Sequence, residues 1–134
     1  MRRGQQLAEA AASFLGAPFR LYGRDAKHGL DCVGLVITSL RAIDIEPAIP
    51  VGYGLRNRSI ERWLAHADQS SLVTVKAPIL PGDILLVRTG PHQHHLMIAE
   101  HESTVIHAHA GLRRVVREPF DWCTTCLNQW RLQD

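Results

Sequence analysis

Residues 30–36 read Leu-Asp-Cys-Val-Gly-Leu-Val, and they mark the point where a turn of small and polar residues gives way to an apolar run. Apolar side chains continue to residue 40, which predicts a helix that begins at Cys32, ends near Ala42 and has Asp31 as its N-cap. Unpaired backbone N–H groups and the positive end of the helix dipole favour a thiolate on the first turn. We therefore expect the pKa of Cys32 to lie below the usual value of about 8.5, which makes Cys32 a candidate nucleophile.

The sequence before this helix predicts another one. Apolar residues recur at helical spacing from about residue 4 to residue 15, and Gly-Ala-Pro at 16–18 supplies a stop of the kind found just past a helix end. Residues 44–80 are interrupted by prolines and glycines, and within them only Ser59–Ala67 indicates a short helix.

The C-terminal part of the chain predicts strands. After Pro81-Gly82, short segments rich in Val, Ile and Leu alternate with turn residues. They are Asp83–Arg88, His95–Glu100, Thr104–His109, Arg114–Glu118 and Asn128–Leu132. Helices followed by strands indicate an α+β fold, with N-terminal helices packed on an antiparallel sheet of about five strands. Since no repeat or linker is visible, residues 1–134 are expected to form a single domain.

The charge balance argues against several classes of partner. The 134 residues are 46% hydrophobic and carry 15 basic and 13 acidic side chains, so the net charge of +2 gives no basis for binding nucleic acid or an anionic membrane. The opening Met-Arg-Arg is not followed by the apolar stretch of a secretory signal, and no apolar segment of about 18 residues is present. We expect a chain without membrane insertion that is cytoplasmic as synthesised, or that leaves by a route its sequence does not encode.

Histidines crowd into one part of the sequence. Six of the eight are His92, His94, His95, His101, His107 and His109. A hairpin closed by residues 100–102 would place His95 directly opposite His107, and the Cβ atoms of opposed residues lie about 4.5–5.5 Å apart. One imidazole then orients the other, so Cys32, His95 and His107 are predicted to form a catalytic triad.

Other interpretations of these residues stay open. His94 is the alternative base, and His109 is the alternative third residue because it points to the same face of its strand as His107. Cys123 and Cys126 have the spacing of half a zinc site, but no common zinc pattern supplies the other ligands, so neither a metal nor a cofactor is expected. With three cysteines in the chain, at least one thiol is free.

Five short motifs follow one another along the chain. They are Gly-Ala-Pro-Phe at 16–19, Leu-Asp-Cys-Val-Gly-Leu-Val at 30–36, Pro-Gly-Asp at 81–83, His-Leu-Met-Ile at 95–98 and Val-Ile-His-Ala at 105–108. In this order and spacing they resemble the NlpC-type family of cell-wall cysteine peptidases, over about residues 4–134. The resemblance implies a papain-like α+β fold in which the helix with the nucleophile packs on the sheet with the base.

The resemblance also implies an activity. Members of the family hydrolyse amide bonds in peptidoglycan stem peptides, typically between D-glutamate and a diamino acid. By position, Cys32 matches the nucleophile, His95 the general base and His107 the third polar residue. The short chain looks most like stand-alone members encoded with phage and gene-transfer-agent tail genes, which implies phage-like tail proteins as partners and delivery to the cell wall in a tail particle.

The residues expected to contact substrate are Phe19, Tyr22, Arg24, Asp31 and His94. Family members commonly have Tyr where this chain has Phe19, and Tyr22 cannot be assumed to replace it. Stabilisation of the oxyanion would then depend more on the backbone N–H of Cys32 and on the base itself. Asp31 serves the helix N-terminus first, and Arg24 is interpreted either as a contact for substrate carboxylates or as a solvated loop charge.

Two other functions fit the same residues. A metal-binding or structural tail protein would use the histidines as zinc or nickel ligands and keep Cys32 in the core. A thiol acyltransferase, or an amidase acting on lipid amides, would keep the thiol site on the same fold and use it for different chemistry.

Overall fold

The computed structural model describes residues 2–46, 72–76, 78–90, 93–101, 103–120 and 125–133. Its helices are α1 (Arg2–Ser13) and α2 (Cys32–Ala42), and between them lies a short hairpin of β1 (Arg24–Asp25) and β2 (Gly29–Leu30). The other strands of the described part are β3 (Leu72–Thr74), β4 (Ile84–Gly90), β5 (Gln93–Ala99), β6 (Thr104–His109), β7 (Arg114–Pro119) and β8 (Thr125–Leu132). This content confirms the predicted α+β class.

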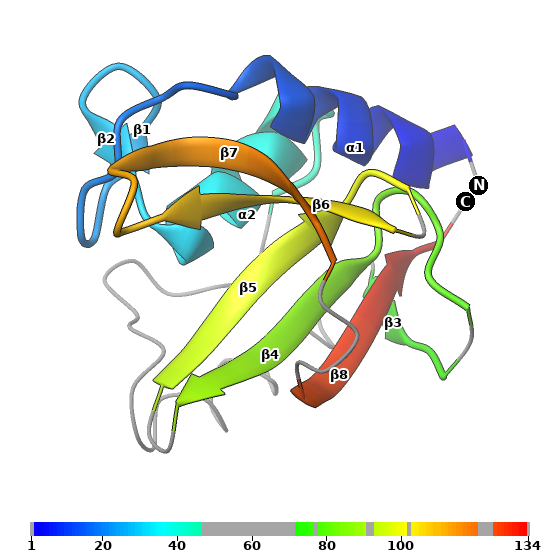
Figure 1. Cartoon of the computed structure of the whole chain (residues 1–134). Helices are drawn as coiled ribbons and strands as arrows, with labels where there is room; N and C mark the ends of the chain where they lie inside the picture. Colours follow the sequence, from blue (N-terminus) through cyan, green and yellow to red (C-terminus); the bar gives the residue numbers. More distant parts are fainter. Residues whose placement is uncertain are drawn as a thin grey trace.

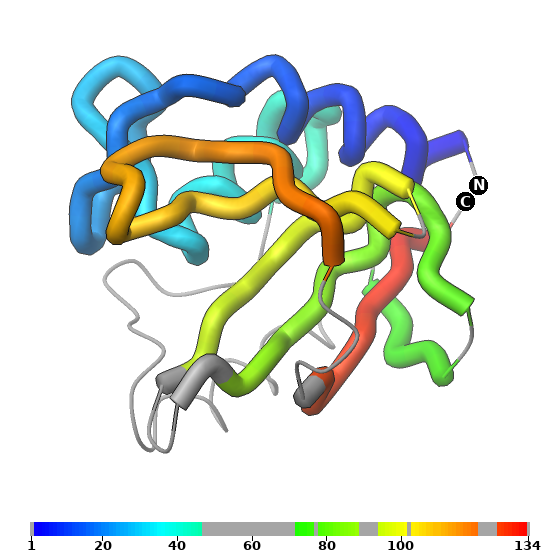
Figure 2. The backbone as a smooth tube through the Cα atoms, viewed as in Figure 1, coloured from blue at the N-terminus to red at the C-terminus, as the bar shows by residue number. Residues whose placement is uncertain are grey.

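The large sheet is antiparallel, with the strand order β3-β8-β4-β5-β6-β7. Strands β4 to β7 follow one another as a meander, and β8 returns to pair with the other side of β4. The start of α1 lies beside the end of β8, where Arg3 Nη1 donates a hydrogen bond to the carbonyl of Gln133 at 3.0 Å (Figure 2). The sheet is strongly twisted, so β6 and β7 cross β4, β5 and β8 at a steep angle (Figure 1).

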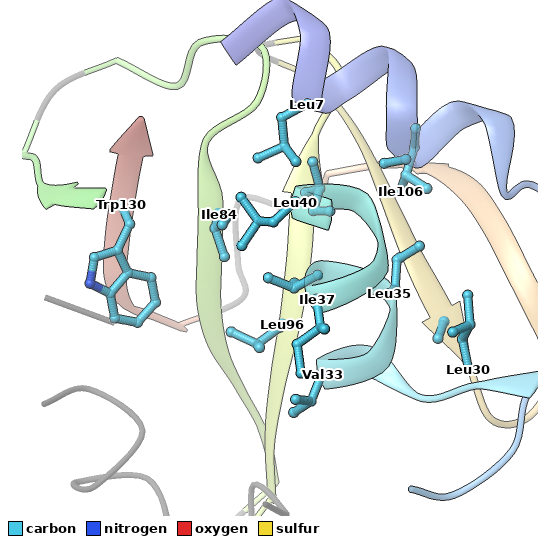
Figure 3. Packing of buried hydrophobic residues seen from close by; sticks show 14 of the residues in the cluster. Leu7, Leu30, Val33, Leu35, Ile37, Leu40, Ile84, Leu96, Ile106 and Trp130 are labelled. Atoms are coloured by element: carbon cyan, nitrogen blue, oxygen red, sulfur yellow. The ribbon is translucent and has the colours of Figure 1, made fainter. Parts of the chain in front are cut away.

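Both helices contribute to the main hydrophobic core on one face of this sheet (Figure 3). Leu7 of α1 and Leu40 of α2 are fully buried, as are the strand residues Ile84, Leu96 and Ile106. Each such side chain stabilises the fold by about 1.5–3 kcal/mol when it leaves water. The other face carries a smaller cluster, which comprises Leu85, Val87, Val105 and Phe120.

Strands β5 and β6 pair over a shorter length than their neighbours do. Their ladder has two residue pairs, one of which joins Ala99 to Val105, whereas β6 and β7 pair along their whole lengths. Beyond the short ladder the two strands diverge (Figure 1). The predicted hairpin, which paired Ala99 with Ser103 and His95 with His107, is therefore wrong in register, and no ladder between β5 and β6 reaches either histidine.

Several boundaries differ from the predicted ones. Helix α1 spans Arg2–Ser13 instead of about 4–15, whereas α2 has its predicted bounds. Strand β3 was not predicted, so the described part of the sheet has six strands instead of about five. The predicted helix Ser59–Ala67 lies outside the described residues. Within the described ranges, neither helix is long and apolar enough to cross a membrane.

Candidate active site

The start of α2 is held by Asp31, which accepts three hydrogen bonds. Its Oδ1 accepts from the backbone N–H of Gly34 and from Arg24 Nη1, each at 2.8 Å, and its Oδ2 accepts from the backbone N–H of Tyr22 at 2.8 Å. Asp31 is the N-cap, as predicted, and only 5% of its surface is exposed. The carboxylate thus ties the loop and the β1–β2 hairpin to the first turn of the helix.

The same turn approaches the preceding loop closely. A Cβ atom at Gly34 would collide with the carbonyl oxygen of Gly23, so this contact requires glycine. The close approach, together with the Asp31 cap, fixes the position of Cys32, which is the first residue of α2.

Cys32 is partly buried and packs against the main core. Burial raises the pKa of Cys32 to about 12, and the nearby backbone N–H groups of Leu96 and Val33, which favour the thiolate, offset only part of this effect. The predicted lowering of the Cys32 pKa is therefore wrong. The sequence pattern identifies the helix start but does not reveal the loss of water around the sulfur.

His95 and His107 face each other across the gap between β5 and β6. His95 Nε2 and His107 Nδ1 are 2.8 Å apart, and the rings meet edge to face with centroids 5.0 Å apart. The predicted contact therefore forms through side chains that bridge two diverging strands. Burial lowers the pKa of His95 to about 3, and the proximity of His107 and His109 adds to this effect. His95 is accordingly neutral at neutral pH.

Glu118 of β7, for which no role was predicted, lies behind His107. Its Oε1 is 3.4 Å from His107 Nε2 and 3.5 Å from His109 Nε2. Burial lowers the pKa of His107, and the charge of Glu118 opposes this shift. Glu118 pairs with Val105 in the ladder, so it is the diagonal neighbour of His107. In the sequence it looks like a surface charge, and only the register of β6 on β7 reveals it.

Cys32 reaches the backbone of β5 and makes no hydrogen bond to the His95 ring. The Cys32 sulfur is beside the backbone N–H of Leu96, the residue that follows His95 on β5. Catalytic hydrogen bonds often tighten only when a substrate binds. The fold therefore brings the Cys32 sulfur to the backbone of β5 at the residue after His95, while the approach of Cys32 to the His95 ring and the catalytic roles of these residues stay predictions.

His94 and Cys126, which were considered as alternatives, have other neighbours. His94 is opposite Arg88 of β4 and is partly buried. Cys126 is exposed on β8, where its Sγ donates to the carbonyl of Asn128 at 3.4 Å, and Cys123 lies outside the described residues. Among the His, Cys, Asp and Glu residues that the structure describes, no group of three or more is arranged to hold a metal ion.

The sequence pattern that defines the NlpC/P60 family matches residues 16–126, from the loop before β1 into β8. This chain belongs to the NlpC/P60 family. The match includes the start of α2 and both histidines of the 2.8 Å contact, and it confirms at family level the resemblance carried by the five motifs. A search of curated proteins gave no significant match.

Solved NlpC/P60 structures share the fold. NlpC2 from Trichomonas vaginalis has a TM-score of 0.72 at 18% identity, and the alignment covers 96% of this chain and 47% of that one. The NlpC/p60 domain of the peptidoglycan hydrolase SagA has a TM-score of 0.66 at 19% identity, with 96% and 98% covered. The P60 domain of an antigen from M. avium subspecies paratuberculosis has a TM-score of 0.68 at 14% identity, with 98% and 95% covered. This chain thus spans about half of the Trichomonas protein.

The predicted substrate-binding residues of this NlpC/P60 chain lie in different environments. Phe19 packs against the main core, and its backbone N–H donates to the carbonyl of Arg113 at 2.9 Å. Tyr22 is 55% exposed and has a φ of 61°. Arg24 and Asp31 bind each other at 2.8 Å, so both already have a partner within the protein. Contact of these residues, or of His94, with substrate stays a prediction.

Proposed function

We propose that this chain is a cysteine peptidase that hydrolyses amide bonds in peptidoglycan stem peptides, typically the bond between D-glutamate and a diamino acid. NlpC/P60 proteins are generally cysteine peptidases that act on peptidoglycan, and SagA, whose domain has a similar fold, is a peptidoglycan hydrolase. In this proposal Cys32 is the nucleophile, His95 is the general base, and His107 orients His95.

The observation that carries the proposal is the 2.8 Å contact between His95 Nε2 and His107 Nδ1, next to the segment that faces the Cys32 sulfur. Because His95 Nε2 is in contact with His107, the other ring nitrogen of His95, Nδ1, is the one that accepts the proton of Cys32. Helix α2 then presents the nucleophile and β5 presents the base, which supports nucleophilic catalysis with an adjacent general base.

The acylation step starts from two neutral groups, because the pKa of Cys32 is raised to about 12 and that of His95 is lowered to about 3. The proton passes from Sγ to His95 Nδ1 while the sulfur forms a bond to the amide carbonyl carbon. Backbone N–H groups at the start of α2, including that of Cys32, stabilise the resulting oxyanion. His95 then gives the proton to the leaving amine as the C–N bond breaks, which leaves a thioester on Cys32.

Hydrolysis of the thioester completes the cycle. His95 Nδ1 takes a proton from a water molecule, whose oxygen attacks the thioester carbonyl, and the C–S bond then breaks. The departing sulfur recovers the proton from His95, so both groups return to their neutral forms. The peptide leaves with a new carboxylic acid group, which loses its proton to solvent, and no cofactor takes part.

Digestion of purified peptidoglycan fragments tests this proposal. We expect the wild-type protein to release peptides cut between D-glutamate and the diamino acid, as measured by mass spectrometry of muropeptides. The Cys32→Ala variant should release none, and its thermal unfolding should show that it is folded. Cys126→Ala is the matched control, because it removes an exposed cysteine on β8 and should retain wild-type cleavage. Equal cleavage by wild type and Cys32→Ala would reject the cysteine mechanism.

We also propose that the protein, made in the cytoplasm, reaches the wall in a phage-like tail particle. The proposal rests on the resemblance of the sequence to family members encoded with tail genes. Purified tail particles should contain peptides of this chain in a constant ratio to a tail protein, as measured by mass spectrometry. If tail particles contain their other proteins but no peptides of this chain, delivery in a tail particle is rejected.

A further inference from the structure

A carboxylate stands at the end of the histidine pair. Glu118 Oε1 is 3.4 Å from His107 Nε2, and the Glu118 side chain is 40% exposed, whereas that of His107 is 8% exposed. Strands β6 and β7 are joined by a full ladder, so the backbone holds the two residues at this spacing (Figure 1). The histidine contact therefore continues from β5 through β6 to a charged group on β7.

The hydrogen-bond partners restrict where the protons of these rings lie. His107 Nε2 is buried and has no hydrogen-bond partner at ideal geometry, and Glu118 Oε1 lies 3.4 Å from it. A buried nitrogen carrying a proton gains from a nearby carboxylate, whereas a buried lone pair facing that carboxylate is repelled. Glu118 thus favours the tautomer of His107 that carries its proton on Nε2.

The arrangement of His109 fits the same carboxylate. His109 Nδ1 accepts the backbone N–H of Leu112 at 3.0 Å, so neutral His109 carries its proton on Nε2, the atom that lies 3.5 Å from Glu118 Oε1. Both histidines therefore present N–H groups to Glu118. Glu118 faces both rings as a hydrogen-bond acceptor.

The tautomer of His107 determines that of His95. With the proton on Nε2, His107 Nδ1 carries a lone pair, and the 2.8 Å contact then requires that His95 Nε2 donates. Neutral His95 with its proton on Nε2 has its acceptor lone pair on Nδ1, which is the nitrogen that must accept the proton of Cys32. We propose that Glu118 is a positioning residue that fixes the tautomers of His107 and His95 so that His95 Nδ1 is ready to accept this proton.

This inference rests on the proposed function in one respect, which is that His95 acts on Cys32. It predicts that the carboxylate affects the rate of the reaction and not the binding of substrate, because Glu118 contacts the histidines and not the nucleophile. In Glu118→Gln the side-chain amide can turn either its oxygen or its nitrogen toward His107, so both tautomers become populated.

The experiment compares Glu118→Gln, Glu118→Asp and the control Glu100→Gln in the full chain, with peptidoglycan fragments as substrate. The control removes the carboxylate of Glu100, which pairs with Arg117 of β7. This carboxylate does not contact His107. For Glu118→Gln we expect kcat to fall about tenfold, since a wrong tautomer removes only part of the 10²–10⁴-fold effect of a general base, with KM within about twofold. Glu118→Asp should recover part of kcat, and Glu100→Gln should match the wild type.

Two-bond proton–nitrogen NMR spectra supply a readout that does not depend on activity. Wild type and Glu100→Gln should show His107 and His95 protonated on Nε2, and Glu118→Gln should show a mixture for His107. Wild-type tautomers and wild-type kcat in Glu118→Gln would overturn the inference. If Cys32→Ala cleaves as well as the wild type, the proposed function fails, but the tautomer spectra still decide whether Glu118 orders the two rings.

Discussion

Two buried polar clusters occupy the same sheet and differ in how completely their hydrogen bonds are filled. At Asp83, just before β4, Oδ1 accepts from Arg131 Nε at 2.9 Å, and Oδ2 accepts from Arg131 Nη2 at 2.9 Å and from Gln129 Nε2 at 2.8 Å. At His107, Nε2 is buried without a hydrogen-bond partner, and Glu118 Oε1 is 3.4 Å away. The first cluster is saturated and the second is not.

The difference in hydrogen bonding suggests different roles, which are stabilisation of the fold for the Asp83 cluster and chemistry for the His107 cluster. Asp83 is fully buried, so its donors compensate for the loss of water and fix the start of β4 against β8 in one arrangement. The histidine cluster has a 2.8 Å contact at one end and contacts of 3.4 and 3.5 Å to Glu118 at the other, so fewer of its hydrogen bonds are filled. We therefore expect variants of the first cluster to lose stability and variants of the second to lose rate.

The largest expected effect is the loss of kcat in the His95→Gln variant. The amide can still contact His107 but cannot accept a proton from Cys32, so kcat should fall by about 10²–10⁴-fold. The free energy of unfolding should stay within about 1 kcal/mol of the wild type, because the shape is nearly kept. Muropeptide release and urea unfolding measure the two quantities. His101→Gln, an exposed histidine in the turn after β5, is the control and should leave both unchanged.

The next effect is on the stability of Asp83→Asn. One carboxylate oxygen is replaced by an NH2 group, which is a hydrogen-bond donor like the guanidinium of Arg131 that it would face. The buried ion pair is also lost. We expect a loss of about 3 kcal/mol in the free energy of unfolding, with kcat of the folded protein unchanged. Glu100→Gln breaks the exposed pair with Arg117 and should cost much less. A fall in kcat without loss of stability would remove the distinction between the two clusters.

The sequence predicted the parts of this molecule that depend on local pattern. The cap at Asp31, the bounds of α2 and the α+β class follow from residues that are neighbours in the chain. Strand β3 was missed because three residues have little pattern of their own, and this strand is defined by its pairing with β8 far along the chain. The local sequence pattern does not show which distant strand will pair with a segment.

The contact between His95 and His107 was predictable as a pair of residues but not in its geometry. His95 and His107 meet as expected, yet through side chains between diverging strands, because sheet twist and the short β5–β6 ladder are tertiary features. Glu118 was missed because its neighbours in space lie on another strand. The direction of the Cys32 pKa shift was wrong because desolvation depends on packing that the helix pattern does not show.

The smallest effect that we predict concerns the dependence of stability on pH, and it tests the neutral state of His95. Burial lowers the pKa of His95 from 6.5 to about 3, so below pH 6.5 the unfolded chain binds a proton at this residue that the folded chain does not bind. Stability should therefore fall as the pH falls, by about 1.4 kcal/mol per pH unit for this group. The pKa of His107 is also lowered by burial, which adds to the slope in the same direction.

Comparison of His95→Gln with the wild type between pH 6.5 and 4.5 isolates His95, because acidic groups such as Glu100, whose pKa is lowered by Arg117, contribute equally to both slopes. Urea unfolding at several pH values in this interval should give a slope for His95→Gln that is smaller than the wild-type slope by about 1.4 kcal/mol per pH unit, while the contribution of His107 remains. Equal slopes would mean that folded His95 is protonated in this range. The histidine pair would then carry a charge at rest, and catalysis could not begin from a neutral thiol and a neutral imidazole.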